Sequence, residues 1–219
     1  MVNISASVLT ADLSALGREV TRVKEAGATM LHIDVMDGVF VPPMTIGDVV
    51  VKSLKTVGGG IIFDTHLMVN EPSERLIENF ANAGSDIISI HTEGFKNTDD
   101  IYKRLEQIKS IGLKAGLAVN PPTPVETAFP FIGLADMFIV MSVNPGYGGQ
   151  AFIPETLGKI KDLRSAIGGR GLDTPIEVDG GINADTAPKA VEAGADILVA
   201  GSYLFNSSDM KKAVDSLRL

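Results

Sequence analysis

Short apolar segments alternate with longer amphipathic segments along the whole chain. The short segments have the composition of buried strands, and the longer ones repeat apolar residues every three or four positions, as helices on a sheet do. This alternation predicts parallel strands joined by crossover helices. We expect strands at residues 4–8, 30–37, 61–68, 87–92, 114–120, 137–143, 176–179 and 197–201, and helices at residues 12–26, 46–56, 73–83, 99–111, 124–131, 154–167, 184–193 and 208–217.

A similar helix ending precedes every second expected strand. An Ala-Gly pair stands at residues 26–27, 83–84 and 193–194, and residues 133–136 are a weaker version of it. Glycine can adopt the left-handed conformation that ends a helix, so the spacing indicates an internal repeat of two strand–helix units. Eight units without a long polar linker favour an α/β fold in which residues 1–219 form one closed (β/α)8 TIM barrel, and not an open doubly wound sheet.

Composition excludes several classes of protein. The chain has 219 residues, of which 45% are hydrophobic, and a formal net charge of −8. Nucleic acids and anionic membranes require a basic surface, so we expect neither as a partner. The absence of cysteine excludes disulfides and thiolate chemistry. No signal-like N-terminus or bilayer-spanning apolar run is evident, and we expect a cytoplasmic location.

Candidate chemistry lies at the ends of three expected strands, where the active sites of such barrels form. Alternate residues of a strand share a face, so His32 and Asp34 project together from the second strand, His66 projects from the third, and Asp179 ends the seventh. Two imidazoles and two carboxylates suit one divalent cation, which could be Zn, Mn, Fe or Co. We therefore expect His32, Asp34, His66 and Asp179 to be metal ligands.

Three further ionisable residues lie on the third, fourth and seventh expected strands: Asp64, His91 and Glu177. Asp64 and Glu177 are placed deeper than the four expected ligands, and we expect them to support those ligands. A lone strand histidine is more often a hydrogen-bonded core residue than a ligand. Because the set of four is complete without His91, we expect it to be structural or supporting.

Glycine-rich segments follow the sixth, seventh and eighth expected strands. Glycine lets backbone N–H groups converge on an oxyanion, and phosphate sites of these barrels commonly use the late loops. None of the three segments contains Lys or Arg, so backbone amides and a serine hydroxyl would have to hold the phosphate. The expected phosphate-binding residues are Gly146, Tyr147, Gly148, Gly149, Gly180, Gly181, Gly201 and Ser202.

The segment from Gly146 to Ala151 also matches the dinucleotide-binding pattern G-x-G-x-x-G/A. Pro154 delays the following helix, and no acidic residue ends a strand at the required distance. We therefore favour a sugar-phosphate loop over a nicotinamide site.

Taken together, these motifs resemble the ribulose-phosphate 3-epimerase family, in order, from about residue 3 to residue 205. The segments that carry the resemblance are residues 7–12, 32–42, 64–68, 141–150 and 177–183. The sequence departs from the family pattern at Ala6, Thr10 and Pro43, which could alter entry loops or sugar preference but leave the proposed catalytic residues intact.

The resemblance implies an isomerase of the pentose phosphate pathway that interconverts D-ribulose 5-phosphate and D-xylulose 5-phosphate. It implies a metal-dependent reaction through an enediolate, with Asp34 and Asp179 as acid and base on opposite faces. It also implies substrate contacts from Ser7, His66 and the three glycine-rich segments, and a homo-oligomer. Two alternatives stay open: an epimerase acting on D-allulose 6-phosphate, and a non-catalytic sugar-phosphate sensor.

Overall fold

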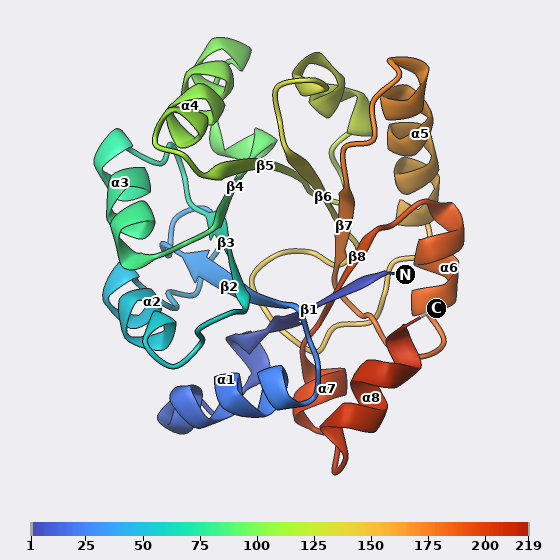
Figure 1. Ribbon diagram of the computed structural model, residues 1–219. Coiled ribbons are helices and arrows are strands. Elements are labelled where there is room, and N and C mark those ends of the chain that lie inside the picture. Colours follow the sequence, from blue (N-terminus) through green and yellow to red (C-terminus); the bar gives the residue numbers. More distant parts are fainter. Residues whose placement is uncertain (1, 219) are drawn as a thin grey trace.

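The strands form a closed parallel barrel surrounded by helices, as the computed structural model of residues 2–218 shows (Figure 1). Each strand pairs with its neighbour in sequence, and β1 pairs with β8 to close the barrel. The expected (β/α)8 architecture is therefore confirmed. The strands are β1 (Asn3–Ser7), β2 (Met30–Met36), β3 (Ile62–Met68), β4 (Ile87–His91), β5 (Lys114–Val119), β6 (Met137–Met141), β7 (Ile176–Asp179) and β8 (Ile197–Ala200).

The helices lie between successive strands and cover the outside of the barrel (Figure 1). Among residues 2–218, none of them is long and apolar enough to cross a membrane. The α-helices are α1 (Leu16–Glu25), α2 (Asp48–Lys55), α3 (Glu74–Ala83), α4 (Thr98–Ser110), α5 (Thr156–Gly169), α6 (Ala187–Ala193), α7 (Ser202–Phe205) and α8 (Met210–Leu217), and the 3₁₀ helices are η1 (Val8–Thr10), η2 (Leu13–Ala15), η3 (Thr92–Gly94) and η4 (Val125–Phe131).

Several short helical segments differ from the sequence prediction: η1 and η3 were not expected, and the helix expected at residues 12–26 begins with η2. The segment expected as a helix at residues 124–131 is the 3₁₀ helix η4, which contains Pro130. Proline lacks the N–H that an α-helix needs in its interior, so the tighter and shorter form replaces it. The short helix α7 was not predicted, because its four residues are too few to show a helical period.

The two faces of each strand have different roles. Leu31, Ile33, Phe63 and Leu67 point outward and are fully buried in the main hydrophobic core, between the strands and the helices. Because side chains alternate along a strand, the residues between them point into the barrel. Register pairs Asp34 with His66 across β2 and β3. The barrel interior therefore carries the polar chemistry, and the layer outside carries most of the hydrophobic packing.

The two-unit repeat reappears as three equivalent carboxylates at the amino ends of β4, β6 and β8. Asp86, Asp136 and Asp196 accept hydrogen bonds from the backbone N–H groups of β3, β5 and β7 respectively. Each carboxylate also pairs with a cationic side chain, which is Lys55, Lys109 or Arg164. These contacts tie alternate strands to the helix ring at the end of the barrel away from the polar cluster.

Replacing Asp136 by Ala should lower the free energy of unfolding by about 1–2 kcal/mol. The Asp136 carboxylate accepts from Ala115 N at 2.9 Å and lies 2.8 Å from Lys109 Nζ. The partly exposed ion pair contributes little, so Asp136→Asn, which keeps an acceptor, should retain most of the stability. Urea denaturation of both variants measures this difference. Equal losses in the two variants would show that the charge, and not the backbone contact, is what matters.

Candidate functional site

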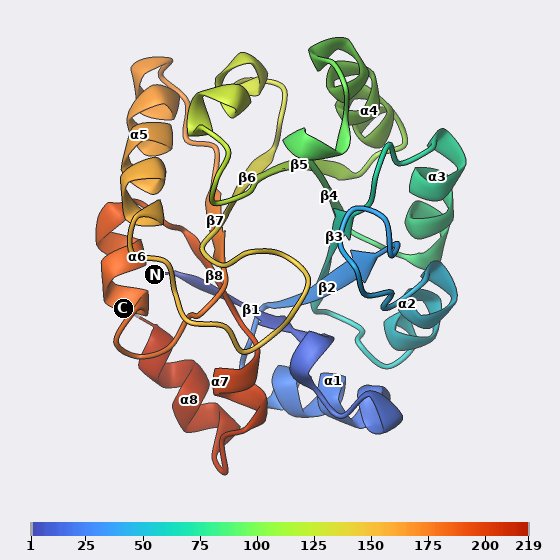
Figure 2. The ribbon, with the colours of Figure 1, turned by 180° about the vertical axis from the view of Figure 1, so that it is seen from behind.

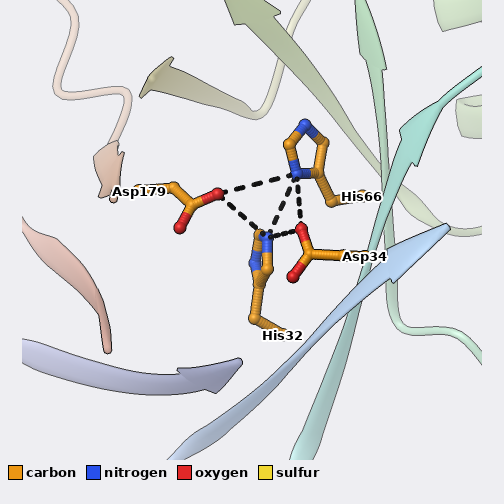
Figure 3. A group of neighbouring side chains, drawn as sticks. All are labelled: His32, Asp34, His66 and Asp179. Carbon is orange, nitrogen blue, oxygen red and sulfur yellow. Dashed lines mark hydrogen bonds and ion pairs between the residues drawn. The ribbon is translucent and has the colours of Figure 1, made fainter. Parts of the chain in front are cut away.

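Four side chains from β2, β3 and β7 converge inside the barrel, near the carboxyl ends of these strands (Figure 3). His32 Nε2 lies 3.1 Å from His66 Nδ1 and 3.3 Å from Asp34 Oδ1. Asp179 Oδ2 lies 3.7 Å from His32 Nε2 and 3.9 Å from His66 Nδ1. The structure thus brings together all four residues that the sequence predicts as metal ligands.

The chemistry and spacing of these four groups fit a divalent cation. In a tetrahedral zinc site with ordinary bond lengths, neighbouring donor atoms are about 3.3 Å apart. The donor atoms of His32, Asp34 and His66 are 3.1–3.3 Å apart, and Asp179 Oδ2 lies 3.7 and 3.9 Å from the two histidines. Both histidine rings are fully buried, and Asp34 is 4% exposed. Nitrogen lone pairs and carboxylate oxygens that face one another in such a buried space need a cation or a proton between them. The cluster could therefore hold one metal ion.

His32 and Asp34 are each oriented by a second polar group. His32 Nδ1 lies 2.6 Å from Asp64 Oδ2 and 3.1 Å from Glu177 Oε1, so its Nε2 is turned toward the cluster. The Ser7 hydroxyl donates to Asp34 Oδ2 at 2.7 Å, which leaves Oδ1 for the cluster. Asp64 and Glu177 occupy the supporting positions that the sequence predicts. Ser7, predicted to contact substrate, also fixes the rotation of the Asp34 carboxylate.

Burial and neighbouring charges shift the pKa values of the two aspartates in opposite directions. Burial raises the pKa of Asp34, but the charge and hydrogen bonds of His32 and His66 lower that pKa well below its usual range. Burial raises the pKa of Asp179 to about 7; His32 opposes that rise and the charge of Asp34 adds to it. A cation bound among the four groups would favour the ionised form of both carboxylates.

A cavity of about 540 Å³ opens above the cluster. Asp34 and Asp179 line it, whereas His32 and His66 are fully buried beneath its floor. Three methionines, Met36, Met68 and Met141, also line the cavity and are at most 4% exposed. The other predicted contact residues that line it are Ser7, Gly146, Tyr147, Gly148, Gly149, Gly180, Gly181, Gly201 and Ser202.

The three glycine-rich segments meet at one side of this cavity. The long loop between β6 and α5 crosses the barrel opening (Figure 2) and brings Gly148 against Thr10 of η1. The Ser142 hydroxyl donates to Gly180 O at 2.7 Å, which joins this loop to the end of β7. Among residues 2–218, no Lys or Arg lines the cavity. An anion bound here would be held by backbone amides and hydroxyls.

Gly181→Ala should raise KM for a phosphorylated sugar by about tenfold or more, with a smaller change in kcat. Gly181 has φ +64°, and an added Cβ would lie 2.4 Å from Phe152 N, so the two loops would have to separate. A phosphate bound at these loops, as the sequence predicts, would contribute to binding at a distance from the reacting carbon, so KM should respond more than kcat. Steady-state kinetics measure both constants.

Gly158→Ala is the matched control for this prediction. Gly158 is an exposed residue of α5, and no atom lies within 4 Å of the position of an added Cβ. Alanine in a helix is favoured over glycine by roughly 0.5–1 kcal/mol, so this variant should keep both kinetic constants and gain slightly in stability. An unchanged KM in Gly181→Ala would show that Gly181 does not contribute to binding of the phosphate.

Two residues that were not predicted as part of the site hold the end of β2 in place. The Thr45 hydroxyl donates to Asp34 O at 2.6 Å and accepts from Met36 N. Asp37 accepts from Val39 N and from Asn70 N, which joins the loops after β2 and β3. Asp37 could have been found from the sequence, because it is a carboxylate that ends an expected strand and precedes a glycine. Thr45 carried none, because its contact depends on how the loop folds back.

Comparison with known proteins gives one consistent family. The model of the Ribulose-phosphate 3 epimerase family matches residues 3–205. The ribulose-phosphate 3-epimerase of Bacillus subtilis (strain 168) is 44% identical over 219 residues, which cover 100% of this chain and 99% of that protein. The ribulose-phosphate 3-epimerase of Escherichia coli (strain K12) is 43% identical over 98% of this chain and 94% of its own length.

Solved structures of low sequence identity share the fold. A crystal structure of 3-hexulose-6-phosphate synthase matches with a TM-score of 0.75 at 16% identity, covering 99% of this chain and 98% of that one. The KGPDC structure from Streptococcus mutans matches with a TM-score of 0.72 at 14% identity, covering 100% of this chain and 96% of that one. At these identities the likeness supports the barrel alone.

Proposed function

The chain belongs to the ribulose-phosphate 3-epimerase family, and on that premise we propose that it interconverts D-ribulose 5-phosphate and D-xylulose 5-phosphate by inverting the configuration at C3. The observation that carries the proposal is the pair of carboxylates, Asp34 on β2 and Asp179 on β7. They approach the same cluster from different strands (Figure 3), and both line the same cavity. Inversion at one carbon needs a proton carrier on each of its faces.

Asp34 and Asp179 would divide the proton transfers between them. One carboxylate removes the C3 proton, and the electron pair of the broken C–H bond moves toward the C2 carbonyl, which gives an enediolate. The other carboxyl group then delivers a proton to the opposite face of C3. The side chains of Met36, Met68 and Met141 in the cavity wall would limit the access of water to this intermediate.

The four clustered residues, His32, Asp34, His66 and Asp179, would hold one divalent cation in this proposal. When bound, the cation would supply positive charge near the oxygens on which negative charge develops. Imidazole and carboxylate donors suit Zn, Mn, Fe and Co alike. The glycine-rich segments would bind the phosphate, which fixes the distance between the phosphate and C3 of the sugar.

The experiment that tests the substrate is a comparison of kcat/KM on two sugar phosphates. Purified protein supplied in turn with each of the four cations is assayed with D-ribulose 5-phosphate and with D-allulose 6-phosphate, which is one carbon longer. The proposal expects the higher kcat/KM on D-ribulose 5-phosphate. A preference for the longer sugar would replace the proposed substrate, and binding of both without turnover would favour a sensor.

A further inference from the structure

A chain of hydrogen-bonding groups runs from the buried cluster to a second cavity, which Glu93 lines. His66 Nε2, the ring nitrogen that faces away from the cluster, lies 2.7 Å from His91 Nε2. His91 Nδ1 lies 3.1 Å from Glu93 Oε2, and Glu93 Oε1 accepts from Asn120 N at 2.8 Å. His91 is 1% exposed, whereas Glu93 lines a cavity of about 330 Å³.

The direction of each hydrogen bond in this chain follows from the carboxylate at its far end. Burial raises the pKa of Glu93, but hydrogen bonds from His91, Thr123 and Asn120 N outweigh burial and lower that pKa below its usual value. An ionised carboxylate can only accept, and a neutral imidazole carries a single proton. A neutral His91 therefore has its proton on Nδ1 and presents a lone pair at Nε2. His66 must then donate from its own Nε2.

His66 Nδ1 is therefore left with a free lone pair. That atom lies 3.1 Å from His32 Nε2 and 3.3 Å from Asp34 Oδ1, at the centre of the four-residue cluster. A histidine binds a metal through the nitrogen that carries no proton, and the group bonded to the other nitrogen decides which one that is. For His32 this group is the Asp64 carboxylate in direct contact. For His66 the corresponding carboxylate is that of Glu93, which acts through the imidazole ring of His91.

We propose that His91 and Glu93 are positioning residues, which hold His66 in the tautomer whose Nδ1 can bind a cation and thereby set the cation affinity of the cluster. The proposal rests on the proposed function only in taking the cluster to be a cation site. It does not depend on which sugar phosphate is the substrate.

Glu93→Gln is the variant that tests this role, because an amide has one acceptor and one donor where the carboxylate has two acceptors. Asn120 N still needs an acceptor, so the amide oxygen turns toward it and the NH₂ group faces His91 Nδ1. His91 then carries its proton on Nε2 and donates to His66 Nε2. The proton of His66 moves to Nδ1, where it blocks the cluster.

The measurement is the dissociation constant of Co²⁺ alone, followed by its visible absorption, together with the tautomer of His66 from ¹⁵N NMR of labelled histidine. Glu93→Gln should raise the dissociation constant about 10- to 100-fold and move the His66 proton to Nδ1. Glu93→Asp, which keeps a carboxylate, should retain the wild-type tautomer. Glu126→Gln removes a charge from an exposed residue outside the chain of hydrogen bonds and should change neither readout.

Wild-type Co²⁺ affinity with an unchanged tautomer in Glu93→Gln would overturn the proposal. If that variant does not fold, the wild-type spectrum decides, since a proton on His66 Nδ1 in the wild type contradicts the proposal. A failure of the proposed function alone would give a different result. The His66 tautomer and its change in Glu93→Gln would then be as expected, but D-ribulose 5-phosphate would not be converted.

Discussion

Asp34→Asn is expected to lower kcat/KM for D-ribulose 5-phosphate by about a thousandfold, within the 10²–10⁴ range of a lost general acid or base. Asparagine has nearly the same shape as aspartate but cannot take up a proton at neutral pH. It also lacks the charge with which Asp34 Oδ1 faces His32 and His66 at 3.3 Å. Steady-state kinetics in both reaction directions measure the loss.

The control for this variant is Asp162→Asn, an equal change of charge at an exposed position on α5, which should leave kcat/KM unchanged. Because asparagine is also a weaker metal ligand, the cation content of each protein has to be measured beside its activity. Retention of more than about a tenth of wild-type kcat/KM by a folded Asp34→Asn protein would show that Asp34 is not a proton carrier.

Asp179→Asn should lower the rate of epimerisation about as much as Asp34→Asn does. It should leave part of the exchange of the C3 proton with solvent intact. Inversion requires both carboxylates, whereas exchange of the C3 proton with solvent on one face requires only one. In D₂O, the sugar-phosphate epimer whose C3 proton faces Asp34 should still exchange it for deuterium and keep its configuration. The other epimer should not exchange. NMR of each substrate incubated alone distinguishes the two patterns.

Asp34→Asn provides the matched comparison, because it should show the opposite preference between the two epimers. Near-normal epimerisation by Asp179→Asn would rule out the scheme with two proton carriers. Exchange of both epimers by a single-carboxylate variant would mean that another group serves the second face of C3.

The barrel and the four clustered residues could be predicted from the sequence because both follow from short-range periodicity. Alternation along a strand places His32 and Asp34 on one face, and the closure of eight strand–helix units brings Asp179 to them. All eight expected strands are present, with ends that differ by no more than two residues. The positions of the glycine-rich segments along one cavity follow from the same closure.

Contacts that depend on loop geometry or on the fit between side chains could not be predicted. The hydroxyl of Thr45 reaches Asp34 O only because the loop after β2 folds back over the strand end. Glu93 lies in a 3₁₀ turn after β4, and its orienting contact with Asn120 N comes from the end of β5. The role of His91 likewise depends on its distance from His66, which no spacing in the sequence gives.

Cation-dependent epimerisation at C3 is measured as deuterium incorporation at C3 of D-ribulose 5-phosphate in D₂O, together with the formation of D-xylulose 5-phosphate. The wild-type protein supplied with a divalent cation should produce both signals, a chelator should remove both, and re-addition of the cation should restore them. Absence of both signals with each of Zn, Mn, Fe and Co would rule out the proposed epimerisation, and persistence of both signals after removal of the cation would rule out its dependence on a metal.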